Sequence, residues 1–187
     1  MQAIGEKMGS VCMNCPRHVY EPLEDHLNWM YNYGMKLTSD EEYAWANDNQ
    51  IEFIPMFIHE TMWSPNCSFT VTDPTKWNYC SVEKIVAFLE DTQSKLDVPM
   101  KRILGFNEAW DDRSASKYIH PYDMADYWKT VQEVAYEMDL QMVSPTYSNH
   151  DEHIEWFAEF LNKCYLMRDD DRPCTVEDIE VLATHEY

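Results

Sequence analysis

The chain has 187 residues, of which 34 are acidic and 14 basic, giving a formal net charge of −20 at pH 7. A surface this acidic repels phosphate groups, so composition argues against nucleic acid and against an anionic membrane as partners, while a neutral polymer meets no such repulsion. The length predicts one domain with a real core.

In chain order, residues 1–26 show no clear periodicity and are treated as an N-terminal segment of unclear structure. Residues 27–187 contain short apolar runs that alternate with amphipathic stretches. The runs predict five strands, over Leu27–Tyr33, Ile51–Ile58, Ile103–Phe106, Leu140–Val143 and Ile179–Ala183.

Helices are predicted between these strands. Ser39 opens a capping box, Ser81 is a second candidate cap, and Pro121 begins the stretch with the most regular helical spacing. A fourth helix carries apolar residues from Ile154 to Cys164, and a long polar loop is expected over Thr61–Tyr79. Strands separated by helices, with near-continuous apolar runs, predict an α/β fold with a buried parallel sheet.

Six cysteines indicate an oxidising compartment. Cys164 and Cys174 flank an acidic loop and are the favoured disulfide pair, while Cys67 and Cys80 bracket another loop. Residues 1–15 lack the basic start and apolar run of a signal peptide. No stretch approaches the roughly 20 apolar residues that span a bilayer.

The most informative motif is Gly105-Phe106-Asn107-Glu108, at the end of an apolar run that predicts a buried strand. An Asn-Glu pair at the carboxyl end of such a strand is used by many barrel glycosidases to protonate a leaving sugar oxygen. The carboxyl group must be held by a neighbour to do this, and the amide of Asn107 is suitably placed.

Five segments, in order, resemble glycoside hydrolase family 128, a group of endo-β-1,3-glucanases on a TIM barrel. They are Trp29–Gly34, Phe53–Met56, Leu104–Glu108, Val143–Pro145 and Ala183–Tyr187. The resemblance implies a partial TIM barrel, because an eight-stranded barrel typically takes about 250 residues. It also implies retaining hydrolysis of β-1,3-glucan. No cofactor is predicted.

The same resemblance implies residue roles. Glu108 would be the general acid/base, and Asn107 would contact the sugar beside it. His185 would reach the reaction centre, and strand-end aromatic residues would line the cleft: Trp29, Tyr31, Tyr33 and Tyr187. From its place just past the predicted strand, Trp110 is a further candidate for stacking on a sugar.

Some features depart from the family. Its nucleophile is a glutamate on the seventh strand, whereas this sequence ends after the sixth, so we expect little hydrolysis by the chain alone. Glu60 and Glu186 follow predicted strands and are candidates for a replacement carboxylate. Both glutamates follow a histidine, but neither His-Glu pair is part of an HExxH zinc motif. The CxxC at Cys12–Cys15 has no second CxxC to complete a zinc site, so no metal site is predicted.

Three interpretations remain open at this stage. The first is an extracellular or cell-wall glycosidase acting on β-glucan, and the second is a non-catalytic β-glucan-binding module derived from one. The third is a truncated chain with no independent function, which would self-associate through uncovered sheet edges.

Overall fold

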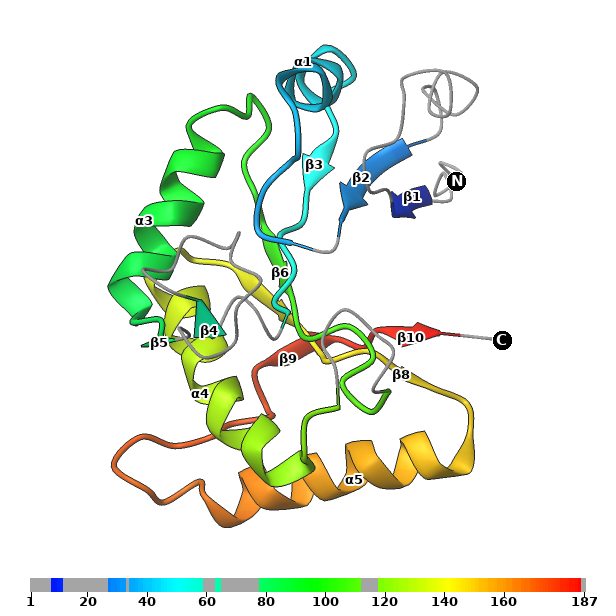
Figure 1. Cartoon of the computed structure of the whole chain (residues 1–187), viewed down its shortest axis with the longest axis vertical. Coiled ribbons are helices and arrows are strands. Elements are labelled where there is room, and N and C mark those ends of the chain that lie inside the picture. The colour runs from blue at the N-terminus through cyan, green and yellow to red at the C-terminus, as the bar shows by residue number, and fades with distance from the viewer. Residues whose placement is uncertain are drawn as a thin grey trace, which may run out of the picture.

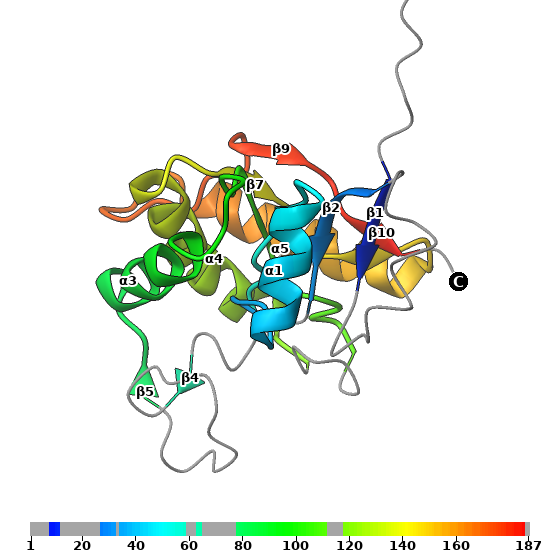
Figure 2. The ribbon, with the colours of Figure 1, turned by 90° about the horizontal axis from the view of Figure 1, so that it is seen from above.

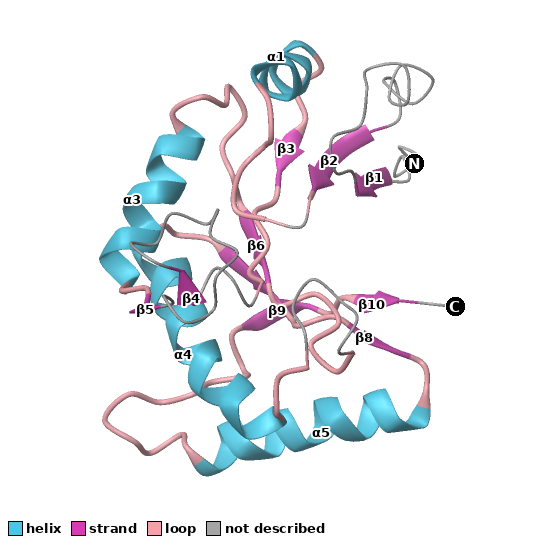
Figure 3. Ribbon diagram, viewed as in Figure 1, coloured by secondary structure: helices cyan, strands magenta, loops and turns pink. Residues whose placement is uncertain are grey.

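The computed structural model describes residues 8–11, 27–32, 34–58, 63–64, 78–111 and 118–185. These form an α/β fold in which short parallel strands make a curved array (Figure 1). Helices α1, α3, α4 and α5 follow one another around the outside of the array, and strands β1 and β10 lie on the side away from α3 (Figure 3). The predicted fold class, a partial α/β barrel, agrees with this arrangement.

The first sheet has the order β1-β2-β3, with all strands parallel. Strand β2 spans Leu27–Tyr31 and β3 spans Glu52–Phe53, both within predicted strands. Strand β1, Met8–Val11, lies in the segment that showed no periodicity. Its pairing with β2 adds a strand to the five that the sequence predicts.

The second sheet has the order β6-β7-β9, again parallel. These strands span Arg102–Leu104, Gln141–Val143 and Ile179–Val181. The two sheets meet where Met56 forms a parallel bridge with Leu104. At this seam Leu104 N–H donates to the carbonyl of Pro55 at 2.8 Å, and Phe57 N–H donates to the carbonyl of Leu104 at 2.9 Å.

Pro55 explains why the predicted strand Ile51–Ile58 is shorter in the structure. Proline has no N–H to donate, so the ladder of β3 is interrupted there and resumes only at the Met56 bridge.

Two short strand pairs were not predicted. Strands β8, Tyr147–Ser148, and β10, Thr184–His185, form a parallel pair that continues the chain beyond β7 and β9. Strands β4, Trp63–Ser64, and β5, Asn78–Tyr79, form an antiparallel pair. The loop predicted over Thr61–Tyr79 therefore contains a short strand pair at these positions, which lie apart from the parallel strands in Figure 2.

The helices form where the sequence predicts them. Helix α1, Asp40–Asp48, begins after Ser39, whose hydroxyl accepts a hydrogen bond from Glu42 N–H at 3.2 Å. Helix α4 begins at its predicted proline, a position where a missing N–H costs no helical bond. This helix spans Pro121–Glu137, whereas α3 spans Val82–Gln93 and α5 spans Asp151–Leu166.

Alternating strand residues divide between two apolar clusters. The larger cluster joins Met30, Ile103 and Met142 to the helices, and it contains the fully buried Trp128 of α4. Burying a large apolar side chain of this kind contributes about 1.5–3 kcal/mol. The smaller cluster lies on the other face of the strands and contains Ile54, Met56, Leu104 and Val143, with Trp29 and Tyr31 packed against it.

A disulfide joins Cys164, near the end of α5, to Cys174, as predicted, with an S–S distance of 2.01 Å. Cys80 is also disulfide-bonded, and Cys67, Cys12 and Cys15 lie outside the described residues. None of the helices in the described part of the chain is long and apolar enough to cross a bilayer.

Candidate active site

The site begins where β6 ends and the chain passes close to the segment after β7. A Cβ atom added at Gly105 would lie 2.6 Å from Pro145 N and 2.9 Å from Ser144 C, so only glycine permits this approach. Gly105 N–H donates to the carbonyl of Val143 at 3.0 Å. The next residue, Phe106, is fully buried and packs on Phe57, with ring centroids 5.9 Å apart.

Residues 107–110 then form a turn that presents Asn107 and Glu108. Asn107 is 2% exposed, whereas Glu108 is half-buried. The Asn107 Nδ2 atom donates to Glu108 Oε2 at 3.3 Å, so the predicted pairing of amide and carboxylate is present in the geometry. Glu108 has a φ of +44°, in the left-handed region that residues with a Cβ rarely adopt.

Thr146 holds this turn from the neighbouring strand connection. Its Oγ1 accepts a hydrogen bond from Glu108 N–H at 2.5 Å and donates to the carbonyl of Phe106 at 3.3 Å. Its own N–H donates to the same carbonyl at 3.0 Å. Thr146 carries no local sequence signal for this role, because its contact with Glu108 spans 38 residues.

Trp110, at the end of the turn, stacks on His153 of α5, with ring centroids 3.4 Å apart and planes 20° apart. His153 Nδ1 lies 2.5 Å from Ser148 Oγ, and Nε2 lies 3.5 Å from Glu152 Oε1. Burial lowers the pKa of His153, an effect that the Glu152 carboxylate partly opposes. His153 also has no local sequence signal, since a single histidine in a helix belongs to no motif.

The carboxylates of Asp111 and Glu108 also act on His153, each raising its pKa slightly against the dominant effect of burial. The imidazole is therefore electrostatically linked to the candidate acid. It stays neutral to a lower pH than an ordinary histidine.

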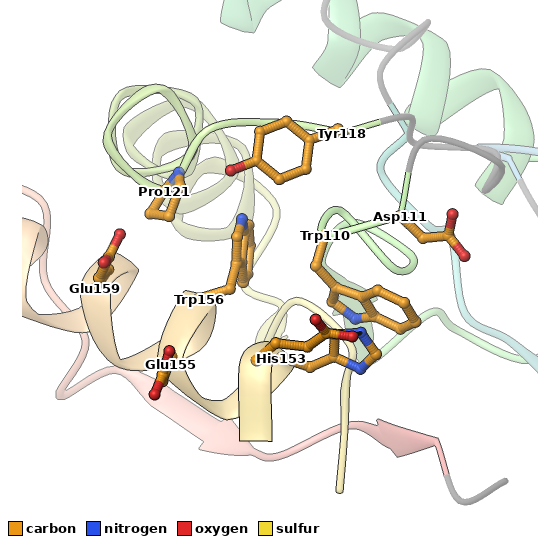
Figure 4. A pocket seen from close by; sticks show the side chains of 9 residues that line it. Trp110, Asp111, Tyr118, Pro121, His153, Glu155, Trp156 and Glu159 are labelled. Carbon is orange, nitrogen blue, oxygen red and sulfur yellow. Dashed lines mark ion pairs between the residues drawn. The ribbon is translucent and has the colours of Figure 1, made fainter. Parts of the chain in front are cut away.

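A cavity of about 610 Å³ opens beside the turn, between it and helices α4 and α5 (Figure 4). Trp110 and His153 lie on one side of it, with Tyr118 and Trp156 on the other. The remaining lining residues are Asp111, Pro121, Glu152, Glu155 and Glu159. Glu108 itself is not among the lining residues, so the cavity adjoins the candidate carboxylate and does not contain it.

Of the residues predicted for the site, Asn107, Glu108 and Trp110 come together in one turn. The backbone of His185 pairs with that of Ser148, whose hydroxyl contacts His153. Tyr33 and Tyr187 lie outside the described residues, as do Glu60 and Glu186. Trp29 and Tyr31 stack with centroids 6.2 Å apart and belong to the smaller apolar cluster.

No group of three or more His, Cys, Asp or Glu side chains within the described ranges is arranged to hold a metal ion. The groups present at the turn are a carboxyl group, its neighbouring amide and flanking aromatic rings. A carboxyl group can transfer a proton, and an aromatic ring can stack on an apolar face of a ligand.

Parallel strands separated by helices, with a carboxylate just past the carboxyl end of one strand, are the arrangement in which α/β-barrel enzymes place their catalytic residues. The sequence matches the family described as glycosyl hydrolase catalytic core over residues 14–187. The chain belongs to this family. A search of curated proteins finds no match.

Solved structures of family 128 glycoside hydrolases have the same fold. An endo-β-1,3-glucanase of subgroup II from Pseudomonas viridiflava superposes with a TM-score of 0.64 at 15% identity, covering 97% of this chain and 61% of its own. A second one, from Sorangium cellulosum, gives 0.62 at 14% identity, covering 95% and 59%. A curdlan-specific exo-β-1,3-glucanase of subgroup III from Blastomyces gilchristii gives 0.53 at 18% identity, covering 95% and 60%.

At identities this low the similarity is one of fold. The chain spans about three fifths of the length of these structures.

Proposed function

We propose that the chain is a glycoside hydrolase domain of the endo-β-1,3-glucanase type, with Glu108 as its general acid/base. The observation that carries the proposal is the Asn107–Glu108 turn at the end of β6, in a chain of the glycosyl hydrolase catalytic core family. The substrate class comes from the similar structures, two of which are endo-β-1,3-glucanases.

In the proposed reaction, the Glu108 carboxyl donates its proton to the glycosidic oxygen as the bond to the anomeric carbon breaks. As a carboxylate, it then takes a proton from the water that attacks the glycosyl intermediate. Asn107 orients the carboxyl group through its amide, whose Nδ2 lies 3.3 Å from Oε2. A retaining mechanism requires a second carboxyl about 5–5.5 Å away as nucleophile.

We propose that the glucan runs from this turn over Trp110 toward the adjoining cavity. Indole rings stack on the apolar faces of sugars, and the carboxylates of Asp111, Glu155 and Glu159 would accept hydrogen bonds from sugar hydroxyls. His185 would approach the same region from β10, and Tyr33 and Tyr187 would line the rest of the cleft.

The alternative is a β-glucan-binding module without catalysis. The cavity favours it, because sugar held between Trp110 and Tyr118 would not need the Glu108 carboxylate, which is not among the lining residues. In either case we propose an extracellular or cell-wall location, which the disulfide supports, since disulfides persist in oxidising compartments.

The deciding experiment measures laminarin hydrolysis and the binding of laminari-oligosaccharides by calorimetry in the same protein samples. The variants are Glu108→Gln and Trp110→Ala, with Glu90→Gln, an exposed glutamate of α3, as the matched control. Hydrolysis that is lost only in Glu108→Gln supports the enzyme, and Glu60→Gln and Glu186→Gln then search for the nucleophile.

Binding without turnover, unchanged in Glu108→Gln and weakened in Trp110→Ala, would support the binding module as the function of this chain by itself, in line with the little hydrolysis expected where no nucleophile is identified. No binding in any variant would contradict both functions.

A further inference from the structure

The backbone of Glu108 is in a conformation that its side chain disfavours. At a φ of +44°, the Cβ of a non-glycine residue crowds its own carbonyl. Such conformations persist only where the surroundings hold them, and they are concentrated at functional sites. The neighbours of Glu108 should therefore include groups that hold its peptide in place.

Thr146 makes the contacts that this requires. Its hydroxyl lies between the two ends of a short stretch of backbone, accepting from Glu108 N–H at 2.5 Å and donating to the carbonyl of Phe106 at 3.3 Å. The residue is 2% exposed, so water does not readily replace its hydroxyl. Gly105 makes this possible, because its missing Cβ lets the 144–146 backbone approach the turn.

We propose that Thr146 is a positioning residue for Glu108. Its hydroxyl keeps the Glu108 peptide in the left-handed conformation and so keeps the carboxyl group beside the amide of Asn107. Without the hydroxyl, the peptide relaxes toward negative φ and carries the carboxyl group away from Nδ2. The catalytic meaning of this inference rests on the proposed function, whereas the positioning itself can be measured without substrate.

The test compares Thr146→Val, which keeps the shape and loses the hydroxyl, with Thr146→Ser, which keeps the hydroxyl. Thr146→Val should still fold, because the N–H of residue 146 continues to donate to the carbonyl of Phe106. Hydrogen exchange of the Glu108 amide, followed by NMR, should be about fivefold faster in Thr146→Val, as expected for the loss of one hydrogen bond. It should be unchanged in Thr146→Ser.

His153 supplies a second readout, which reports where the carboxylate of Glu108 lies. Burial is the main influence on the pKa of His153, and the surrounding charges are those of Glu152, His150, Asp111 and Glu108. Removing the Glu108 charge in Glu108→Gln should lower the pKa of His153, as measured by NMR. Thr146→Val should also lower the pKa of His153, whereas Thr146→Ser should leave it unchanged. In the double variant Glu108→Gln/Thr146→Val, the pKa of His153 should be the same as in Glu108→Gln alone.

The proposal is overturned if Thr146→Val leaves both the amide exchange and the His153 titration unchanged, or if Thr146→Ser behaves like Thr146→Val. Should Thr146→Val not fold, Thr146→Ala, which is smaller and also lacks the hydroxyl, takes its place with the same expected results. Titration with laminari-oligosaccharides separates a failure of the proposed function from a failure of the positioning role of Thr146. If the unaltered protein shows no binding, the proposed function fails while the positioning result still stands or falls independently.

Discussion

At the amino end of β6, Arg102 and Glu52 form a close ion pair, whereas at the carboxyl end Glu108 is held by the hydroxyl of Thr146 in a disfavoured conformation. Arg102 Nη2 donates to Glu52 Oε2 at 2.6 Å, and Nε donates to Oε1 at 3.2 Å. The carboxylate side chain of the pair is 8% exposed and the guanidinium side chain 25%. The contacts at the amino end of the strand thus stabilise the fold, whereas those at the carboxyl end hold a carboxyl group in place at some cost in stability. The two faces of α/β barrels differ in the same way.

The largest effect is expected at the amino end. Arg102→Met would leave the Glu52 carboxylate buried, with the Lys101 N–H at 3.2 Å as the hydrogen-bond donor that it retains among the described residues. Breaking a buried pair in this way should cost about 3 kcal/mol of unfolding free energy, measured by urea denaturation. The double variant Arg102→Met/Glu52→Leu should recover most of it, because an apolar pair leaves no uncompensated charge. A cost below about 1 kcal/mol for Arg102→Met would show that the pair is effectively solvated.

Gly105→Ala tests the carboxyl end. The new Cβ would lie 2.6 Å from Pro145 N, and backbone cannot move away as a flexible side chain can. We expect a loss of about 2 kcal/mol in the same denaturation experiment. Gly34→Ala is the matched control, because among the described residues the atom nearest to its Cβ would be Asn32 Oδ1 at 3.6 Å, an ordinary contact. Equal effects at the two glycines would contradict the close approach of residues 105 and 145.

Glu108→Gly should have a smaller effect, of opposite sign. Relief of the left-handed conformation should contribute about 1–2 kcal/mol, offset by about 0.5–1 kcal/mol for the greater freedom of glycine in the unfolded chain. The net expectation is a gain of about 0.5 kcal/mol in unfolding free energy, together with loss of any hydrolysis. Glu90→Gly, in the middle of α3, should instead lose about 1 kcal/mol. Destabilisation by both substitutions would remove the evidence for strain at Glu108.

The smallest effect concerns pH. Because burial places the pKa of His153 below its unfolded value of about 6.5, the unfolded chain takes up this proton first as the pH falls. The unfolding free energy therefore keeps the full contribution of the neutral imidazole above pH 6.5. It loses this contribution as the pH falls from 6.5 toward the pKa of His153 in the folded state. His153→Gln should therefore reduce the decline in urea midpoint between pH 7.5 and pH 5.5. An unchanged decline would show that other groups account for it.

Much of the fold was predictable because its signals are local. The cap at Ser39, the proline that begins α4 and the apolar runs of β6 and β7 each act within a few residues. Strand β1 was missed because its four residues, Met-Gly-Ser-Val, lack alternation and depend on pairing with β2. The two-residue strands β4 and β5 depend on one another in the same way.

The residues of the candidate site also differ in whether their signal in the sequence is local. Asn107, Glu108 and Trp110 follow one another in the chain after a recognisable strand, so the sequence reveals them together. Thr146 and His153 come from the next strand–helix unit, and their roles arise only when β7 and α5 pack beside β6. A threonine after a proline predicts a turn, and nothing local shows that its hydroxyl reaches a glutamate 38 residues away.

The seam between Met56 and Leu104 has a consequence for how the molecule unfolds. Beside its backbone bonds, Asn47 of α1 accepts from Asp97 N–H and donates to the Lys95 carbonyl, and the larger apolar cluster contains residues of both sheets. Separating the β1-β2-β3 sheet from the rest would expose this shared core to water. The two sheets should therefore unfold together, in a single transition.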